Sequence, residues 1–282
     1  MTLLKLQPSE STSGVSLWVG TSGYSYPEWV DAGIYPPGTK SARMLPLYAR
    51  DFAVTELNYT WYQMPRAEAI ERQRALVPPI FKFCAKLTRT MTHEIDAKTW
   101  QNEAAKYRHG IAPLLQSRQL LAILIQFSAG FERSTKNRNY LSALLEELQG
   151  LPLAVEFRNA SWANGKVFTE LERRQVTLVS VDEPSLPGLF PSLDIVSNPE
   201  LFYVRFHGRN AKGWGSGKMA QQFDYNYSDD ELAKWLEEKL QRMITLAKNG
   251  VLFFNNHVRG QAPRNAQQLV KLLTEAGWRA GG

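Results

Sequence analysis

Pairs of polar residues separated by one position stand near the ends of three apolar runs in this sequence. They are Glu56 with Asn58, Glu156 with Arg158, and Arg205 with His207. Side chains two residues apart on a β-strand point to the same face, so each pair presents both members to one side of its strand. A charge inside a protein is costly unless it is paired or used. The pairs therefore indicate either chemistry or a buried ion-pair network, for example between Glu156 and Arg205.

The candidate catalytic chemistry comes from the two carboxylates and the histidine of these pairs, and from Lys86 at the end of another apolar run. Two carboxylates that face one cavity can take different pKa values and divide the acid and base roles. A lysine with a lowered pKa can attack a carbonyl as a nucleophile, although an ion pair between Lys86 and Glu56 is the simpler interpretation. The predicted catalytic residues are Glu56, Glu156, His207 and Lys86.

Arginine residues near the same strand ends predict the class of substrate. The guanidinium group suits a carboxylate or a phosphate, and the formal net charge of +6 favours anionic partners. We expect Arg158 and Arg205 to bind a small phosphorylated or carboxylated molecule. The other predicted substrate-binding residues are Asn58, Tyr24, Trp162, Asn255, Asn256 and Arg209. The leading hypothesis is a metal-independent enzyme, with no cofactor, that acts on such an anion.

Two other functions compete with this hypothesis. The first is a hydrolase or isomerase with a divalent metal, because mixed carboxylate and histidine sites hold such ions. Its ligands would be Glu156, Asp182, His207 and His257. The second is a non-catalytic protein that binds a nucleic acid or a metabolite. The basic residues are scattered and form no run of five, which disfavours nucleic acid as the partner.

Eight short apolar runs predict the strands that must position these residues. They span 16–20, 53–58, 81–86, 121–127, 153–158, 176–181, 201–206 and 251–255. Helical patterns between them span 41–51, 67–77, 96–116, 134–149, 167–174, 228–248 and 262–276. This alternation predicts an α/β fold, a parallel (β/α)8 TIM-like barrel. An open doubly wound sheet would alternate in the same way, but no glycine-rich dinucleotide motif follows the first strand.

Long connections follow three of the predicted strands, over residues 21–40, 182–200 and 207–227. In a barrel they would all lie on the face at the carboxyl ends of the strands, where barrel enzymes build their active sites. The segment 208–217 contains the glycine-rich sequence GWGSG and predicts a mobile lid. The polar strand ends and these connections therefore predict one functional face.

Six segments of the sequence form a pattern that extends over nearly the whole chain. They are GTSGYSYPEW (20–29), TELNYTWYQMP (55–65), KLTRTMTHE (86–94), AVEFRNASW (154–162), YVRFHGR (203–209) and FFNNHVRGQAPRNA (253–266). In this order they resemble the family named domain of unknown function 72, the YecE-like proteins. The resemblance implies a TIM-like barrel and no established reaction. The family pattern usually has Asp where His257 stands, so an acid or ligand at that position would be changed here.

The remaining features concern domains and compartment. We predict a flexible tail over residues 1–14 and a single barrel domain over 15–282. The single cysteine, Cys84, excludes an internal disulfide, and no apolar run approaches the ~20 residues that span a bilayer. With no signal peptide in the N-terminal segment, we expect a cytoplasmic protein without a membrane partner. The sequence leaves the oligomeric state open.

Overall fold

Eight parallel strands close into a barrel in the computed structural model, which describes residues 6–8 and 14–280. The barrel strands are β2 (Ser16–Ser22), β3 (Val54–Leu57), β4 (Lys82–Lys86), β5 (Leu120–Gln126), β6 (Leu153–Glu156), β7 (Thr177–Asp182), β8 (Phe202–Phe206) and β9 (Asn249–Phe254). Each pairs with the next, and β9 pairs with β2 from Ser16↔Asn249 to Thr21↔Phe254. The predicted TIM-like barrel is confirmed, and the closing pairing excludes an open sheet.

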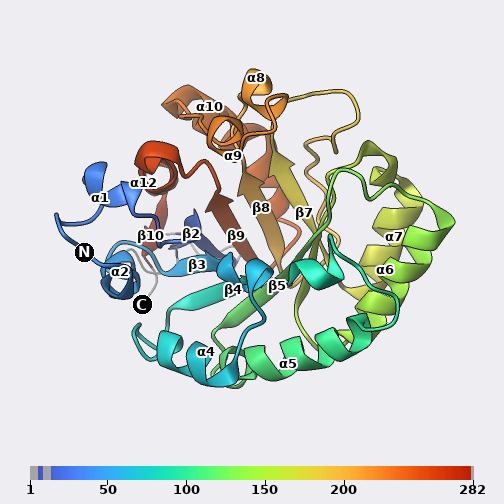
Figure 1. The fold of residues 1–282 in the computed structure, drawn as a ribbon. Coiled ribbons are helices and arrows are strands. Elements are labelled where there is room, and N and C mark those ends of the chain that lie inside the picture. The colour runs from blue at the N-terminus through green and yellow to red at the C-terminus, as the bar shows by residue number, and fades with distance from the viewer. Residues whose placement is uncertain (1–5, 9–13, 281–282) are drawn as a thin grey trace.

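Helices alternate with the strands, and the longer ones surround the barrel (Figure 1). They are α1 (Glu28–Asp31), α2 (Ser41–Tyr48), α3 (Tyr59–Tyr62), α4 (Ala67–Arg74), α5 (Trp100–Gln116), α6 (Thr135–Glu147), α7 (Gly165–Arg174), α8 (Ala211–Trp214), α9 (Met219–Gln222), α10 (Asp229–Trp235), α11 (Gln241–Ile244) and α12 (Gln261–Glu275). A π-helical turn, Leu236–Leu240, joins α10 to α11, and short 3-10 turns span Arg89–Met91, Ala160–Trp162 and Val258–Gly260.

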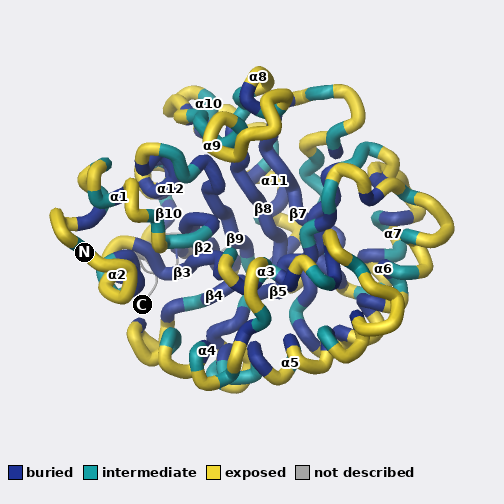
Figure 2. The backbone as a smooth tube through the Cα atoms, viewed as in Figure 1, coloured by how far each residue is buried: buried dark blue, intermediate teal, exposed yellow. Residues whose placement is uncertain are grey.

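An apolar stripe and a capping residue coincide in α6, where the Ser134 side chain accepts from the Asn137 backbone N–H. In α6, Leu141, Leu144 and Leu145 are buried on one side, at the spacing that brings side chains together on a helix. A capping box begins α10, because the Ser228 and Glu231 side chains each accept a hydrogen bond from the other's backbone N–H. Figure 2 shows buried segments along the strands and exposed segments on the outer sides of the helices.

A short antiparallel addition extends the sheet beyond the barrel. Strand β1 (Leu6–Pro8) pairs with β10 (Trp278–Ala280), and Leu6 also pairs with Leu17 at the start of β2. Leu6–Pro8 falls within the predicted flexible tail, so the structure corrects that part of the prediction. A strand of three residues is too short to give a sequence period, and its pairing depends on the other end of the chain. Of the rest of the predicted tail, only Gly14 lies within the described residues.

The connections at the carboxyl ends of the strands include the predicted long ones, and they surround the barrel mouth. Residues 23–40 contain α1, residues 183–201 form an extended connection, and residues 207–228 contain α8 and α9. Gly208 has φ +88°, and a Cβ there would lie 2.5 Å from Cβ of Tyr225, so this turn requires glycine. Among the described residues, no helix combines the length and the apolar character that a membrane span requires.

Candidate functional site

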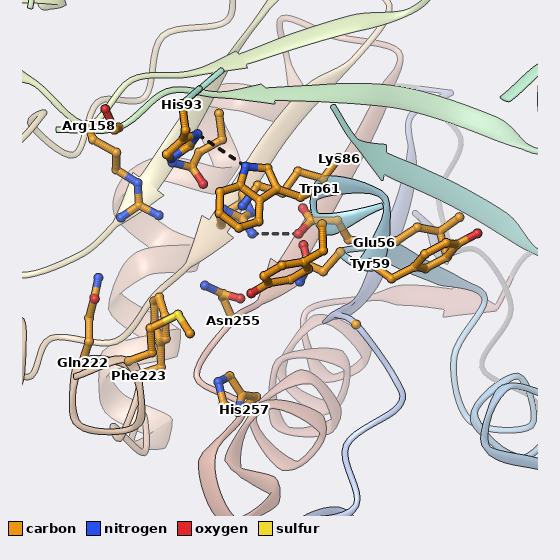
Figure 3. A pocket seen from close by; sticks show the side chains of 18 of the residues that line it. Glu56, Tyr59, Trp61, Lys86, His93, Arg158, Gln222, Phe223, Asn255 and His257 are labelled. Atoms are coloured by element: carbon orange, nitrogen blue, oxygen red, sulfur yellow. Dashed lines mark hydrogen bonds and ion pairs between the residues drawn. The ribbon is translucent and has the colours of Figure 1, made fainter. Parts of the chain in front are cut away.

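A cavity of about 790 Å³ opens at the carboxyl ends of the barrel strands. Figure 3 shows side chains from several strands and connections directed into it. Its polar lining includes Glu56, Asn58, Lys86, His93, Gln126, Arg158, Arg205, Asn255 and His257. Its aromatic lining is Tyr24, Tyr26, Tyr59, Trp61, Tyr62, Trp214 and Phe223. Most of the predicted site residues thus come together at one place.

Arg205 lies at the centre of the polar floor and is almost fully buried. Its Nη1 donates to Oε2 of Glu156 and its Nη2 to Oε1 of Glu56, each at 2.7 Å. The Tyr203 hydroxyl donates to the second carboxylate oxygen of Glu56. Burial lowers the pKa of Arg205, but the two carboxylates outweigh burial and raise it. Arg205 therefore keeps its charge and fixes both carboxylates in place.

Arg158 extends this network toward the cavity. Its Nε lies 2.6 Å from Oε1 of Glu156, and its Nη1 donates to Oε2 of Glu183 at 2.7 Å. Its guanidinium carbon lies 5.3 Å from the centre of the Trp214 ring, which is within reach of a cation–π contact. The guanidinium is thus held by carboxylates on one side and covered by an aromatic ring from the α8 segment.

Glu156 is fully buried between the two arginines and does not line the cavity. Burial alone would raise its pKa, but Arg158 and Arg205 together hold the pKa well below its usual range. The carboxylate is therefore ionised at neutral pH and already bound on both sides. This position places Glu156 in the ion-pair network that the sequence left as the alternative, and its catalytic role stays a prediction.

His207 is also fully buried and does not line the cavity. Its Nε2 lies 3.0 Å from Nη2 of Arg158, and its Nδ1 lies 3.0 Å from Nδ2 of Asn255. Burial, and then the charge of Arg158, lower its pKa to about 3, so the ring is neutral at pH 7. The neutral ring contacts Arg158 and Asn255, and the predicted catalytic role of His207 stays a prediction.

Glu183 is a member of this network that the sequence prediction missed. It follows β7, contacts Arg158 and is almost fully buried. Burial raises its pKa to about 7, against the opposing effect of the Arg158 charge. Two adjacent acids in the sequence pointed to this place: Asp182 at the end of β7 and Glu183 directly after it. The prediction named Asp182, whereas Glu183 is the acid that contacts Arg158.

Lys86 ends β4 with its amine at the cavity. Its Nζ lies 5.1 Å from the centre of the Trp61 ring, and within the described part of the chain it has no hydrogen bond or ion pair. The expected ion pair with Glu56 is absent because both Glu56 oxygens are taken by Arg205 and Tyr203. Burial, and then the charge of Arg205, lower the pKa of Lys86 to about 7.

Several predicted substrate-binding residues lie outside the cavity lining. Arg209 donates two bonds to the Asp182 carboxylate, at 2.8 and 2.7 Å. Trp162 is buried and stacks on Phe157, with 4.5 Å between ring centres. Asn256 is buried and binds the Tyr225 carbonyl and Asn265. Their side chains contact other residues of the protein here, and their predicted roles in substrate binding stay predictions. By contrast, Tyr24, Asn58 and Asn255 do line the cavity.

The four predicted metal ligands do not converge. Glu156 and His207 share the buried network, Asp182 binds Arg209, and the His257 ring stacks on Tyr26 at 4.6 Å between centres. Nowhere in residues 6–8 and 14–280 do three His, Cys, Asp or Glu side chains form a group able to hold a metal ion. The ligand set of the metal hypothesis is therefore wrong for the described residues.

The segment between β8 and α10 covers one side of the cavity. Trp214, Met219, Gln222 and Phe223 from this segment line it, and Asn210 caps α8 by accepting from the Gly213 backbone N–H. Of the predicted lid, residues 208–217, Trp214 lines the cavity. The mobility of this lid stays a prediction.

Comparisons with known proteins place this chain among barrels of one family. The family model described as "Protein of unknown function DUF72" matches residues 18–280. The UPF0759 protein YunF of Bacillus subtilis is 29% identical over 91% of this chain and 94% of its own length. A DUF72 family protein of Thermotoga maritima has a solved structure with a TM-score of 0.82, 35% identity, and coverage of 92% of this chain and 99% of its own. The solved structure of another DUF72 family protein, from Enterococcus faecalis, has a TM-score of 0.82 and 30% identity, with coverage of 92% of this chain and 95% of its own.

Proposed function

The chain belongs to the DUF72 family of proteins of unknown function, and on that premise we propose that it is an enzyme acting on a small anionic molecule in the cavity at the barrel mouth. In this proposal Lys86 is the catalytic group that reaches the substrate, and Glu56, whose two oxygens are bonded to Arg205 and Tyr203, holds Arg205 in place. Arg158 and Arg205 supply positive charge, and Glu156 with His207 holds the arginines in place.

The balance of charge at the cavity floor supports an anionic substrate. Three cations, Lys86, Arg158 and Arg205, lie around two carboxylates, Glu56 and Glu156. Glu183 adds at most a partial negative charge near pH 7, because burial raises its pKa to about 7. With Lys86 protonated and Glu183 neutral, these groups carry one positive charge in excess, which attracts an anion.

The single observation that carries the proposal is the amine of Lys86. It faces the cavity without a carboxylate partner, whereas the other cations of the floor are bound by glutamates. A lysine in such surroundings is free to bind an anion or to react. Perturbed ionisable groups gathered in a cleft are typical of functional sites.

Thermal unfolding with a panel of anions tests this proposal. Phosphate, sulfate, pyruvate and sugar phosphates are added to the wild type, to Lys86→Met and to the matched control Lys82→Met. Lys82 begins the same strand, and its amine donates to the Arg118 carbonyl, away from the cavity. A ligand at a hundred times its Kd stabilises the folded form by about 2.7 kcal/mol.

We expect at least one anion to raise Tm for the wild type and the control. Lys86→Met should weaken the binding of that anion about tenfold or more, because a hydrogen bond to a charged group contributes roughly 1.5–3 kcal/mol. An equal response in Lys86→Met, or no response of the wild type to any anion, would contradict the proposal.

A further inference from the structure

We propose that Lys86 forms an imine with the carbonyl group of its substrate, so that the substrate class is a small carbonyl compound carrying a carboxylate or phosphate. This inference rests on the proposed function, because the same cavity must first bind the anion. It adds a covalent step and names the atom that performs it, the Lys86 Nζ.

The first argument is the fixed position of the Lys86 backbone. Its carbonyl accepts hydrogen bonds from the Thr60 hydroxyl at 2.6 Å and from the Tyr107 hydroxyl at 3.1 Å. Strand β4 also pairs with β5 on one side, through residues 83–86, and with β3 on the other side. Such anchoring presents the side chain from a rigid element, which a covalent step requires.

The second argument is the state of the amine itself. Nζ has no acceptor among the described residues and lies over Trp61, whose ring covers it on one side (Figure 3). An amine bound to a carboxylate is held protonated and cannot attack a carbonyl. Since burial and the Arg205 charge lower the Lys86 pKa to about 7, a large part of the amine is neutral at physiological pH.

The third argument is that the fixed positive charges and the reactive amine belong to different residues of the cavity. Arg158 and Arg205 keep the positive charge in the floor, each held by buried glutamates. Their charge adds to that of Lys86 in drawing the anionic end of a substrate into the cavity. The lysine is then available for the other end, next to the aromatic residues that line the cavity.

The proposed step balances without any other reactant. The lone pair of the neutral amine forms a bond to the carbonyl carbon, and the carbonyl oxygen takes up a proton to give a carbinolamine. Loss of the hydroxyl group with the remaining amine proton releases one water molecule and leaves a carbon–nitrogen double bond. The carbonyl oxygen and the two amine hydrogens thus leave as water, and nothing is oxidised or reduced.

Reductive trapping tests the inference. The intact protein is incubated at pH 7 with pyruvate or with glycolaldehyde phosphate, and sodium cyanoborohydride then reduces any imine to a stable amine. Peptide mass spectrometry reports the modified lysine. Lys86→Met and Lys82→Met are treated in parallel, and the thermal unfolding of each sample with the same probes is recorded.

We expect the label on Lys86 at a rate ~10-fold or more above that of Lys82, because an ordinary lysine is almost entirely protonated at this pH. Lys86→Met should lose that label and Lys82→Met should retain it. A Tm response to the probes without labelling of Lys86 overturns the imine and leaves the anion site standing. Absence of both responses overturns the inference together with the proposed function. Equal labelling of Lys86 and Lys82 also overturns the inference.

Discussion

Glu183 and His207 contact the same guanidinium, that of Arg158, and burial changes the pKa of each in the direction that removes its charge. Burial raises the pKa of the Glu183 carboxyl to about 7 and lowers the pKa of the His207 imidazole to about 3. In the unfolded chain both would titrate closer to their ordinary values, so each makes the stability depend on pH, with opposite signs.

Replacement of Glu183 by Gln isolates one of these contributions. At pH values between about 4.5 and about 7, the folded wild type binds the Glu183 proton more tightly than the unfolded chain does. The stability from Glu183 is therefore present at low pH and is lost as pH rises toward 7. At ~1.4 kcal/mol per pKa unit the loss is roughly 3 kcal/mol.

We expect the unfolding free energy of Glu183→Gln, relative to wild type, to increase between pH 5 and pH 7.5. Urea denaturation at both pH values measures this difference, in which the opposite contribution of His207 cancels. A difference that is independent of pH would show that Glu183 is ionised across this range in the folded protein.

The elements themselves follow closely from the sequence, and their side-chain partners do not. Each of the eight predicted strands and seven predicted helices has a counterpart in the structure. Alternation indicated that the two members of each pair, such as Glu56 and Asn58, share one side of a strand, but it does not identify their partners on other strands. The spacing does not predict that Arg158 and Arg205 enclose Glu156. Partners such as Glu183 come from a different strand end, which no local pattern reveals.

The turn after β8 offers a test at the scale of one element. Gly208 and Gly188 have nearly the same backbone conformation, φ +88° and +85°, but only at Gly208 would a Cβ collide with another residue, Tyr225. Both Gly208→Ala and Gly188→Ala carry the cost of a left-handed alanine, about 1–2 kcal/mol. Gly208→Ala should lose at least ~1 kcal/mol more through steric overlap and weaken anion binding through displacement of His207. Urea denaturation and the anion thermal-shift assay measure both effects, and equal losses in the two variants would refute this reason for the glycine.

On the scale of the whole molecule, the buried charges join opposite walls of the barrel. Arg205 of β8 connects Glu56 of β3 with Glu156 of β6, and it also reaches the Ser22 hydroxyl at the end of β2. The network is therefore a part of the global fold as well as the floor of the site. Loss of one member leaves buried charges of the others without a partner.

We accordingly predict that Glu156→Gln lowers the unfolding free energy by about 3 kcal/mol or more, measured by urea denaturation. The control is Glu200→Gln, which removes an exposed ion pair with Lys248 at 2.6 Å and should cost at most ~1 kcal/mol. Comparable losses in the two variants would mean that the buried network adds little to stability.

Leu6 and Ala280 face each other as partners in the ladder between β1 and β10, and Leu6 also pairs beside the start of β2, at the opposite end of the barrel from the cavity. Because these two positions are neighbours, a short linker from Ala280 to Leu6 could close the backbone while the chain is opened at an exposed connection elsewhere, which gives a circularly permuted barrel.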